Sequence, residues 1–95
     1  MIRTLGNREA EKIFYQQFSL KYPLEIQKVA LRKLMMIDNA DGINDLKVPP
    51  ANHLEKLKGK RIGQYSIRIS RQYRICFSVS ATNDFFDVEI IDYHS

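Results

Sequence analysis

Residues 59–94 read GKRIGQYSIRISRQYRICFSVSATNDFFDVEIIDYH, and this stretch decides the fold. Apolar and polar side chains alternate along residues 65–69 and again along 73–79, and a further apolar run extends over 85–93. A period of two, with β-branched and aromatic residues on one parity, is typical of strands that bury one face. We therefore expect antiparallel strands that form a curved sheet with one apolar and one cationic face. The residues expected to be buried on the last strand are Phe86, Val88 and Ile90.

The cationic face follows from the pairing of the first two of these strands. If their apolar faces are matched, Ile69 lies opposite Tyr73, and Arg68 then lies opposite Arg74. Like charges directly opposite each other destabilise a sheet by up to ~1 kcal/mol. Two outcomes are open: an anion bound between the two arginines, or two side chains that splay apart into water.

Residues 1–58 predict a short N-terminal strand and a pair of helices that cover the apolar face of the sheet. Residues 1–5 form a short apolar start that can dock on the later strands. Asn7 is expected to cap the first helix, and Pro23 suits the first turn of the second. Gly42 is expected to end the second helix in the left-handed conformation. The residues expected on the buried stripe of the first helix are Ala10, Ile13, Phe14 and Phe18.

Together these elements predict an α+β fold, in which an N-terminal strand and an α-helical hairpin pack on a twisted antiparallel β-sheet. A chain of 95 residues can build one modest core, so residues 1–95 are expected to form a single domain. The cations of the second helix are expected on its solvated outer side; they are Lys28, Arg32 and Lys33.

Charge is distributed unevenly along the chain. Residues 56–74 hold seven Lys or Arg and no acid, whereas residues 75–95 hold four acids and no Lys or Arg. A basic block of this kind is typical of a surface that meets a phosphate-bearing partner. An acidic protein partner and a merely solvated face explain it equally well, so the block alone does not choose between them.

Several classes of chemistry are not supported by the residues. Two histidines, His53 and His94, and the single Cys76 lack the spacing of a metal site, so no metal or other cofactor is expected. No glycine-rich phosphate loop or serine-hydrolase motif occurs. The chain has no apolar run of 18 residues and no visible secretory signal, and one cysteine cannot form an internal disulfide. A cytoplasmic protein that does not contact membranes is therefore expected.

Metal-free cleavage of RNA remains possible on these residues. It requires a base for the ribose 2′-OH, cations for the charge on phosphorus, and an acid for the leaving 5′ oxygen. Residues 92–94 supply an Asp-Tyr-His sequence at the end of the last strand, and the sheet should place Lys58, Arg68 and Arg74 nearby. The alternative is a frayed chain end with no role, because the tripeptide is a weak motif by itself.

The segment LEKLKGKRIGQYSIRISRQYRICF at 54–77, followed by VEIIDYH at 88–94, resembles the HigB-type toxins of the RelE/ParE superfamily. The resemblance implies a RelE-like fold and a type II toxin–antitoxin system. It also implies a ribosome-dependent, metal-free mRNA endonuclease that cleaves translated mRNA in the A site and inhibits translation. The partners it implies are a HigA-like helix-turn-helix antitoxin, the 70S ribosome and mRNA, with operator DNA reached only through the antitoxin.

The same resemblance assigns roles to individual residues. Asp92 and His94 would perform acid–base work, Tyr93 would stack on or position a base, and Lys58 and Arg74 would stabilise phosphate charge. Some family members carry a histidine where this chain has Glu55, so either Glu55 substitutes, His53 reaches in, or cleavage is weaker. The residues assigned to RNA binding are His53, Lys56, Lys60, Arg61, Arg68, Arg71 and Tyr73.

Two other functions stay open at this point. A toxin of the same superfamily could inhibit DNA gyrase without being an enzyme, as ParE relatives do; that class does not need a terminal acid–base cluster. A module that binds RNA or antitoxin after its catalysis has lapsed is the other alternative, and the substitution at Glu55 favours it.

Overall fold

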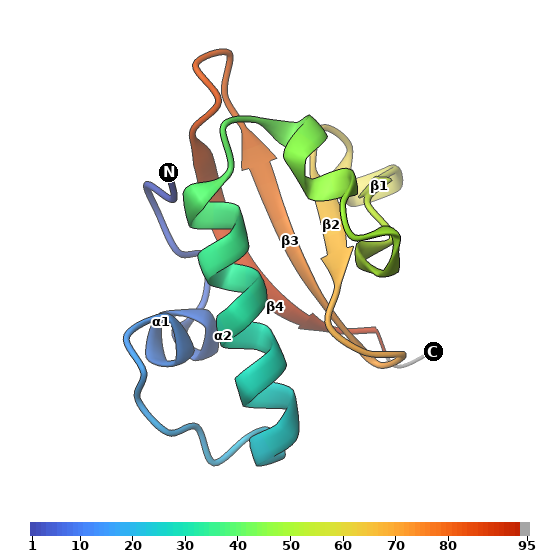
Figure 1. Cartoon of the computed structure of the whole chain (residues 1–95). Coiled ribbons are helices and arrows are strands. Elements are labelled where there is room, and N and C mark those ends of the chain that lie inside the picture. The colour runs from blue at the N-terminus through green and yellow to red at the C-terminus, as the bar shows by residue number, and fades with distance from the viewer. Residues whose placement is uncertain (94–95) are drawn as a thin grey trace.

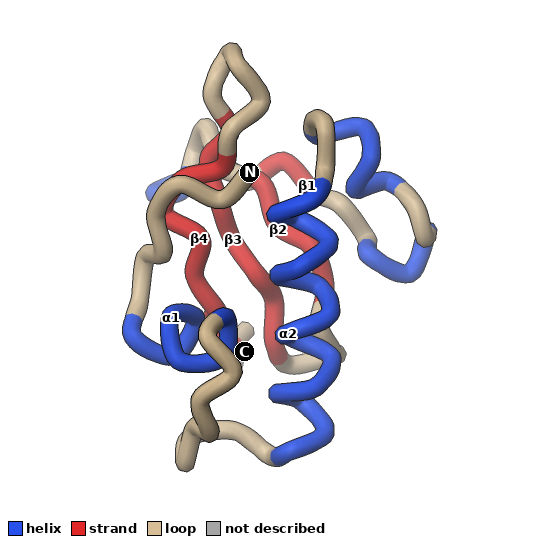
Figure 2. Tube along the Cα trace, turned by 60° about the vertical axis from the view of Figure 1, so that its left-hand side comes forward, coloured by secondary structure: helices blue, strands red, loops and turns tan. Residues whose placement is uncertain are grey.

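The computed structural model describes residues 1–93, in which two helices lie against one face of a four-stranded antiparallel sheet (Figures 1 and 2). The helices are α1 (Arg8–Phe14) and α2 (Leu24–Asn39), and α2 runs across the sheet. The strands are β1 (Glu55–Lys56), β2 (Tyr65–Arg68), β3 (Tyr73–Val79) and β4 (Phe85–Asp92), in that spatial order. Three short 3₁₀ segments, η1 (Ile43–Lys47), η2 (Pro50–Asn52) and η3 (Gly59–Arg61), lie in the connections. The expected α+β, RelE-like arrangement is confirmed.

The β2–β3 hairpin has the register that its alternation predicts. The Ile69 N–H donates to the Tyr73 carbonyl at 2.9 Å, and Arg68 lies opposite Arg74. The core lies between this apolar face and α2, and its fully buried side chains include Leu34 and Ile37 from the helix and Phe77 from β3. The hairpin therefore presents one face to the helices and leaves the other for function.

Strand β4 differs from the expected pattern at its first residues. Phe85 is fully buried and Phe86 is not, whereas Val88 and Ile90 are buried as expected. The pairing of β3 with β4 shifts register between Cys76 and Ser78 because β4 contains a bulge, with Asp87 at φ 52°. The extra residue in β4 exchanges the buried and exposed positions in the part of the strand that precedes it. The assignment of Phe86 to the buried face was therefore wrong.

The N-terminus docks beside this bulge. Instead of a full strand, residues 1–5 form isolated parallel bridges from Ile2 to Phe85 and from Leu5 to Val88. The Asp87 N–H donates to the Thr4 hydroxyl at 2.8 Å, and a Cβ at Gly6 would lie 2.8 Å from the Asp87 carbonyl oxygen. Contacts between segments far apart in sequence therefore hold the bulge in place.

The close approach at Gly6 leads to a test of this packing. Gly6→Ala is expected to lower the free energy of unfolding by about 1–3 kcal/mol, because the added methyl group meets backbone that cannot move freely. Urea denaturation followed by circular dichroism measures the loss. Gly42→Ala is the matched control, since its Cβ would meet only the Asn83 side chain at 3.3 Å. Equal stability of Gly6→Ala and wild type would contradict the packing described for the bulge.

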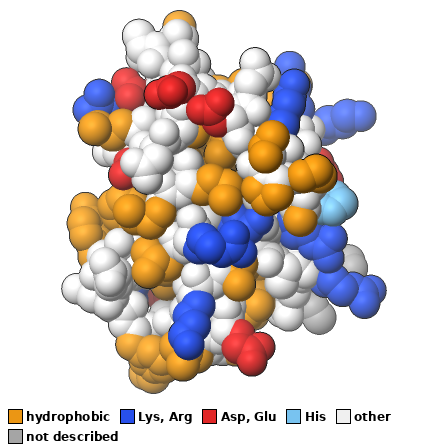
Figure 3. Space-filling view, in the orientation of Figure 1, with side chains coloured by type: hydrophobic (Ala, Val, Ile, Leu, Met, Phe, Trp, Pro, Cys, Tyr) orange, Lys and Arg blue, Asp and Glu red, His pale blue; other side chains and the backbone are white. Residues whose placement is uncertain are grey.

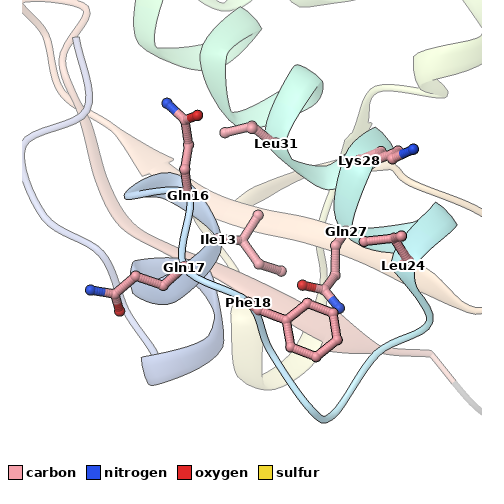
Figure 4. Close-up of a pocket in the computed structure, with 8 residues that line it drawn as sticks. All are labelled: Ile13, Gln16, Gln17, Phe18, Leu24, Gln27, Lys28 and Leu31. Atoms are coloured by element: carbon pink, nitrogen blue, oxygen red, sulfur yellow. The ribbon is translucent and has the colours of Figure 1, made fainter.

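Both helices end earlier than expected. Asn7 caps α1 as predicted, accepting from the Ala10 N–H, but the helix stops at Phe14 because Gln16 adopts the left-handed conformation at φ 59°. Phe18 is therefore 62% exposed and does not extend the buried stripe; it lines an open pocket beside Ile13 (Figure 4). The second helix ends at Asn39, and Gly42 is extended at φ 174°, so its assignment as a left-handed cap was wrong.

One cation of α2 is inside the protein. Lys33 is only 4% exposed, and its ammonium group donates to the Asn52 side-chain oxygen. Arg32 and Lys28 are exposed, as expected for the outer side of the helix. Placing Lys33 on the solvated side was wrong because η2 folds back over α2 and brings Asn52 against it. None of the helices in residues 1–93 is long and apolar enough to span a membrane.

Candidate functional site

The face of the sheet that points away from the helices carries the polar residues of the hairpin, and we call it the outer face. Residues directly opposite each other in an antiparallel sheet share a face, so the register identifies its members. The pairs Glu55–Ser66, Ser66–Cys76, Arg68–Arg74, Arg74–Ile91 and Cys76–Glu89 place their side chains on this face.

Arg74 lies at the centre of the outer face. Its side chain is nearly buried, with 8% of the residue exposed, and its donors have specific partners. Nε donates to the Ser66 hydroxyl at 2.8 Å, and Nη2 donates to the His53 carbonyl at 2.7 Å. The carboxylate of Glu55, which is 57% exposed, lies 3.9 Å from the same Nη2. The guanidinium is therefore fixed in position with a carboxylate at its open side.

Two other segments of the chain place these hydrogen-bond acceptors beside Arg74. His53 follows η2 in the left-handed conformation at φ 45°, which turns its carbonyl toward the arginine. The Ser66 side chain is fully buried one strand away. Because hydroxyl and carbonyl oxygens accept without bearing a full charge, the positive charge of Arg74 is oriented but not neutralised by them.

The ring of Tyr93 lies beside the guanidinium of Arg74. Its ring centroid lies 5.8 Å from the guanidinium carbon, and the residue is 42% exposed. The Tyr93 N–H donates to the Gln72 carbonyl at 2.5 Å, which holds the chain beyond β4 against the β2–β3 turn. The predicted proximity of Tyr93 and Arg74 is therefore observed. An exposed aromatic ring over a cation is suited to stacking on a nucleobase beside its phosphate.

A second ion pair borders the site. Arg61 Nη1 donates to Glu89 Oε1 at 2.5 Å and to Gln64 Oε1 at 3.0 Å, and the hydrogen bond to Glu89 raises the pKa of Arg61. Arg61 and Lys60 line an open cavity with Ser78 next to this pair. Burial raises the pKa of the nearby Cys76 thiol, so the thiol stays protonated and is not a nucleophile.

The remaining predicted cations surround the outer face or lie on the segments beside it. Glu55 and Lys56 are neighbours on β1, so their side chains leave the strand in opposite directions. Lys58 and Lys60 are exposed in the connection after β1, and Arg71 is exposed in the β2–β3 turn. His94 lies outside the described residues.

Asp92 is not part of the group around Arg74. It lies opposite Tyr73, whereas Arg74 lies opposite Ile91, so Asp92 points to the other side of β4 from Tyr93. There it accepts from the Gln72 side chain at 3.2 Å. On that side of the strand the charge of Asp92 acts on Tyr22. Burial raises the pKa of Tyr22 to about 12, and the charges of Glu9, Tyr73 and Asp92 raise it further. The register therefore places Asp92 on the opposite face of the sheet from Arg74, and the expected approach of these two residues is not observed.

One assignment on the hairpin needs correction, and the structure also bears on one question that the sequence left open. Tyr73 is 9% exposed and packs edge-on against Tyr22 in the core, with ring centroids 4.9 Å apart, so its ring is not available to RNA. Arg68 lies opposite Arg74 in the register, but the donors of Arg74 are turned toward Ser66 and His53, so the Arg74 side chain does not splay into water. Arg68 lines a groove at the edge of β2.

A family model of HigB-like toxins, described as RelE-like toxins of the type II toxin–antitoxin system HigB, matches residues 8–94. The chain belongs to this family. This HigB-like toxin is 42% identical over 55 residues to Toxin HigB-1 of Vibrio cholerae serotype O1; the match covers 58% of each chain. It is also 51% identical over 57 residues to an uncharacterized protein of Haemophilus influenzae, covering 60% of this chain and 56% of that protein. The matches thus span little more than half the length of these relatives.

Solved structures agree on the fold of this HigB-like toxin. A chain of the heterotetrameric YoeB–YefM toxin–antitoxin complex from Staphylococcus aureus superposes with a TM-score of 0.60 at 24% identity, covering 100% of this chain and 99% of that one. The YoeB/ParE toxin from Agrobacterium tumefaciens gives a TM-score of 0.57 at 18% identity, covering 99% and 98%. At these identities the likeness concerns the fold alone.

Ser66 and Glu89 are site residues of this HigB-like toxin that the sequence reading missed. Both lie on the polar parity of their strands, so their position on the outer face could have been read from the register. Their partners could not, because Arg61 reaches Glu89 from a loop 28 residues away. Among residues 1–93, no group of three or more His, Cys, Asp or Glu side chains could hold a metal ion.

Proposed function

We propose that this toxin is a ribosome-dependent mRNA endonuclease that stops translation by cutting mRNA in the A site. The observation that carries the proposal is the oriented guanidinium of Arg74, with the exposed Tyr93 ring on one side and the Glu55 carboxylate 3.9 Å away. A fixed cation, a stacking surface and a carboxylate base on one face are the elements that RNA cleavage requires.

The chemistry assigns one step to each of these groups. Glu55 accepts the proton of the ribose 2′-OH, and the 2′ oxygen then attacks phosphorus as the bond to the 5′ oxygen breaks. The fragments end in a 2′,3′-cyclic phosphate and a 5′-hydroxyl. Arg74 stabilises the charge that develops on the phosphate oxygens, with help from Lys58 in the adjoining loop. The histidines, His53 and His94, are the candidates for the acid that protonates the 5′ oxygen, because a protonated imidazole can transfer its proton to a leaving group.

The same proposal includes the partners and the compartment. The toxin acts in the cytoplasm on mRNA bound to the 70S ribosome, and a HigA-like helix-turn-helix antitoxin neutralises it. The similarity in fold to a toxin chain from a toxin–antitoxin complex supports an antitoxin partner. The exposed cations Lys56, Lys60 and Arg71 add sequence-independent attraction to RNA phosphates.

Purified toxin added to a reconstituted bacterial translation reaction tests the proposal. Primer extension on the recovered mRNA is expected to show new ends within translated codons, and far fewer when initiation is blocked. Arrested synthesis with intact mRNA would overturn the nuclease assignment. A parallel incubation with DNA gyrase and plasmid would then show whether the toxin instead traps cleaved DNA.

The position of Asp92 favours one second candidate, a module that binds RNA or antitoxin without cleaving. The family resemblance gives Asp92 an acid–base role, yet its carboxylate lies on the other side of β4 from Tyr93. If Glu55 does not supply the base, RNA would bind at Arg74 without reacting. RNA binding without new mRNA ends in the translation reaction would favour this candidate.

A further inference from the structure

A cationic groove lies between α2, η2 and the end of β2, outside the group around Arg74. It has a volume of about 380 Å³ and is lined by side chains from all three elements. The lining includes Val29, Arg32 and Lys33 from α2, His53 after η2, and Arg68 and Ile69 at the end of β2. Figure 3 shows Lys and Arg side chains gathered across the middle of this face of the molecule, over α2 and toward the β1 edge of the sheet.

The groove combines several positive charges without a carboxylate among its lining residues. Arg32, Lys33 and Arg68 contribute three cations, and within residues 1–93 none of them takes part in an ion pair. Cations gathered in a cleft repel one another and concentrate anions from solution. The groove is therefore electrostatically prepared for a negatively charged ligand.

Lys33 adds a buried positive charge to those that Arg32 and Arg68 bring to the groove. Its ammonium group is held inside the wall by the Asn52 side chain, which itself donates to the Leu46 carbonyl at 3.1 Å. Burial lowers the pKa of Lys33, and the neighbouring Arg32 lowers it further. A bound anion would relieve both effects, because it offsets the lost solvation and the like-charge repulsion.

The groove is also continuous with the candidate active site. The carbonyl of His53 binds Arg74, while the same residue lines the groove. Arg68 lies directly opposite Arg74 in the sheet and also lines the groove. A polynucleotide whose scissile phosphate lies at Arg74 can therefore continue around the β2 edge into the groove. A protein partner that inserts a single acidic side chain would not need the groove to adjoin the site at Arg74.

We propose that the groove binds the phosphate backbone of RNA next to the cleavage site. The inference rests on the proposed function and extends it, because it assigns part of the RNA path to α2, a helix that the sequence reading left as solvated. Arginine suits this role because its planar fork binds phosphate oxygens in pairs. The contacts would be independent of base sequence.

The test measures RNA binding separately from cleavage. A single-stranded RNA with 2′-O-methyl riboses cannot be cut by 2′-OH attack, and its affinity is measured by fluorescence anisotropy between 0.05 and 0.4 M salt, a range of roughly the scale over which counterion release acts. The double variant Arg32→Gln/Arg68→Gln is compared with Lys21→Gln/Lys28→Gln. The control removes the same charge from exposed positions outside the groove.

Each phosphate contact on single strands contributes a slope of about 0.7 to the dependence of log affinity on log salt. The groove variant is expected to lose about 1.4 from this slope and to bind about 10- to 30-fold more weakly near 0.1 M salt. The control variant should stay close to wild type. Circular dichroism on both variants checks that the fold is retained.

Three results would overturn the groove assignment: equal losses in both double variants, a slope unchanged in the groove variant, or no salt-dependent binding by wild type. Unchanged RNA binding with loss of antitoxin binding would assign the groove to a protein partner instead. Failure of the proposed function looks different, because wild-type toxin would then leave translated mRNA intact whatever the groove variants do.

Discussion

Replacing Arg74 with glutamine is expected to lower the rate of mRNA cleavage about 100- to 1000-fold. The guanidinium is held by Ser66 and by the His53 carbonyl before substrate arrives, so its charge acts on the developing phosphate charge without reorganisation. Glutamine keeps a hydrogen-bonding group but removes the charge. The initial rate of mRNA cutting in the translation reaction measures the effect.

The expected loss must be separated from a loss of fold, because Arg74 is nearly buried. Circular dichroism and the urea midpoint report whether the variant folds, and Arg74→Lys provides a second variant that keeps the charge but cannot make both hydrogen bonds. Arg8→Gln on the exposed surface of α1 is the matched control. A folded Arg74→Gln protein that cuts mRNA at the wild-type rate would remove Arg74 from the site.

Replacing Glu55 with glutamine is expected to lower the cleavage rate about 100- to 10,000-fold, the range typical of a lost general base. The carboxylate lies 3.9 Å from Arg74 and is 57% exposed, so it can reach both solvent and a substrate bound at the guanidinium. An amide of the same shape cannot accept the proton. The single-turnover rate of cleavage of ribosome-bound mRNA measures the effect.

Glu55→Gln should have little effect on stability, since exposed ion pairs contribute little. Glu11→Gln, an exposed acid on α1, serves as the control for removing one negative charge. Cleavage by Glu55→Gln at the wild-type rate would mean that another group accepts the proton.

Much of the fold follows from local patterns in the sequence. Alternation in the hairpin predicted the pairing of Arg68 with Arg74 because a buried apolar face allows only one register. The bulge in β4 was not predictable in this way. It depends on Thr4 and Gly6, more than 80 residues earlier, which contact the backbone of Asp87. Burial of Lys33 likewise depends on Asn52, which lies 19 residues further along the chain.

The candidate site was predictable in part for the same reasons. The expected approach of Tyr93 to Arg74 is observed, because the end of β4 lies beside β3. The placement of Asp92 with them overlooked strand geometry, since neighbouring residues on a strand point to opposite faces. Asp92 and Tyr93 are neighbours, so one of them had to leave the outer face. The partners of Arg74 could not be predicted in full, because one of them is the backbone carbonyl of His53. A side-chain motif gives no information about backbone acceptors.

The most direct test of the account compares Glu55→Gln with Asp92→Asn in the same ribosome-bound mRNA cleavage assay. Each variant changes one exposed carboxylate to its amide, but the carboxylates lie on different sides of the sheet. The account predicts that Glu55→Gln loses most of its cleavage rate while Asp92→Asn stays within a few-fold of wild type. Full activity in Glu55→Gln, with cleavage lost in Asp92→Asn, would contradict it.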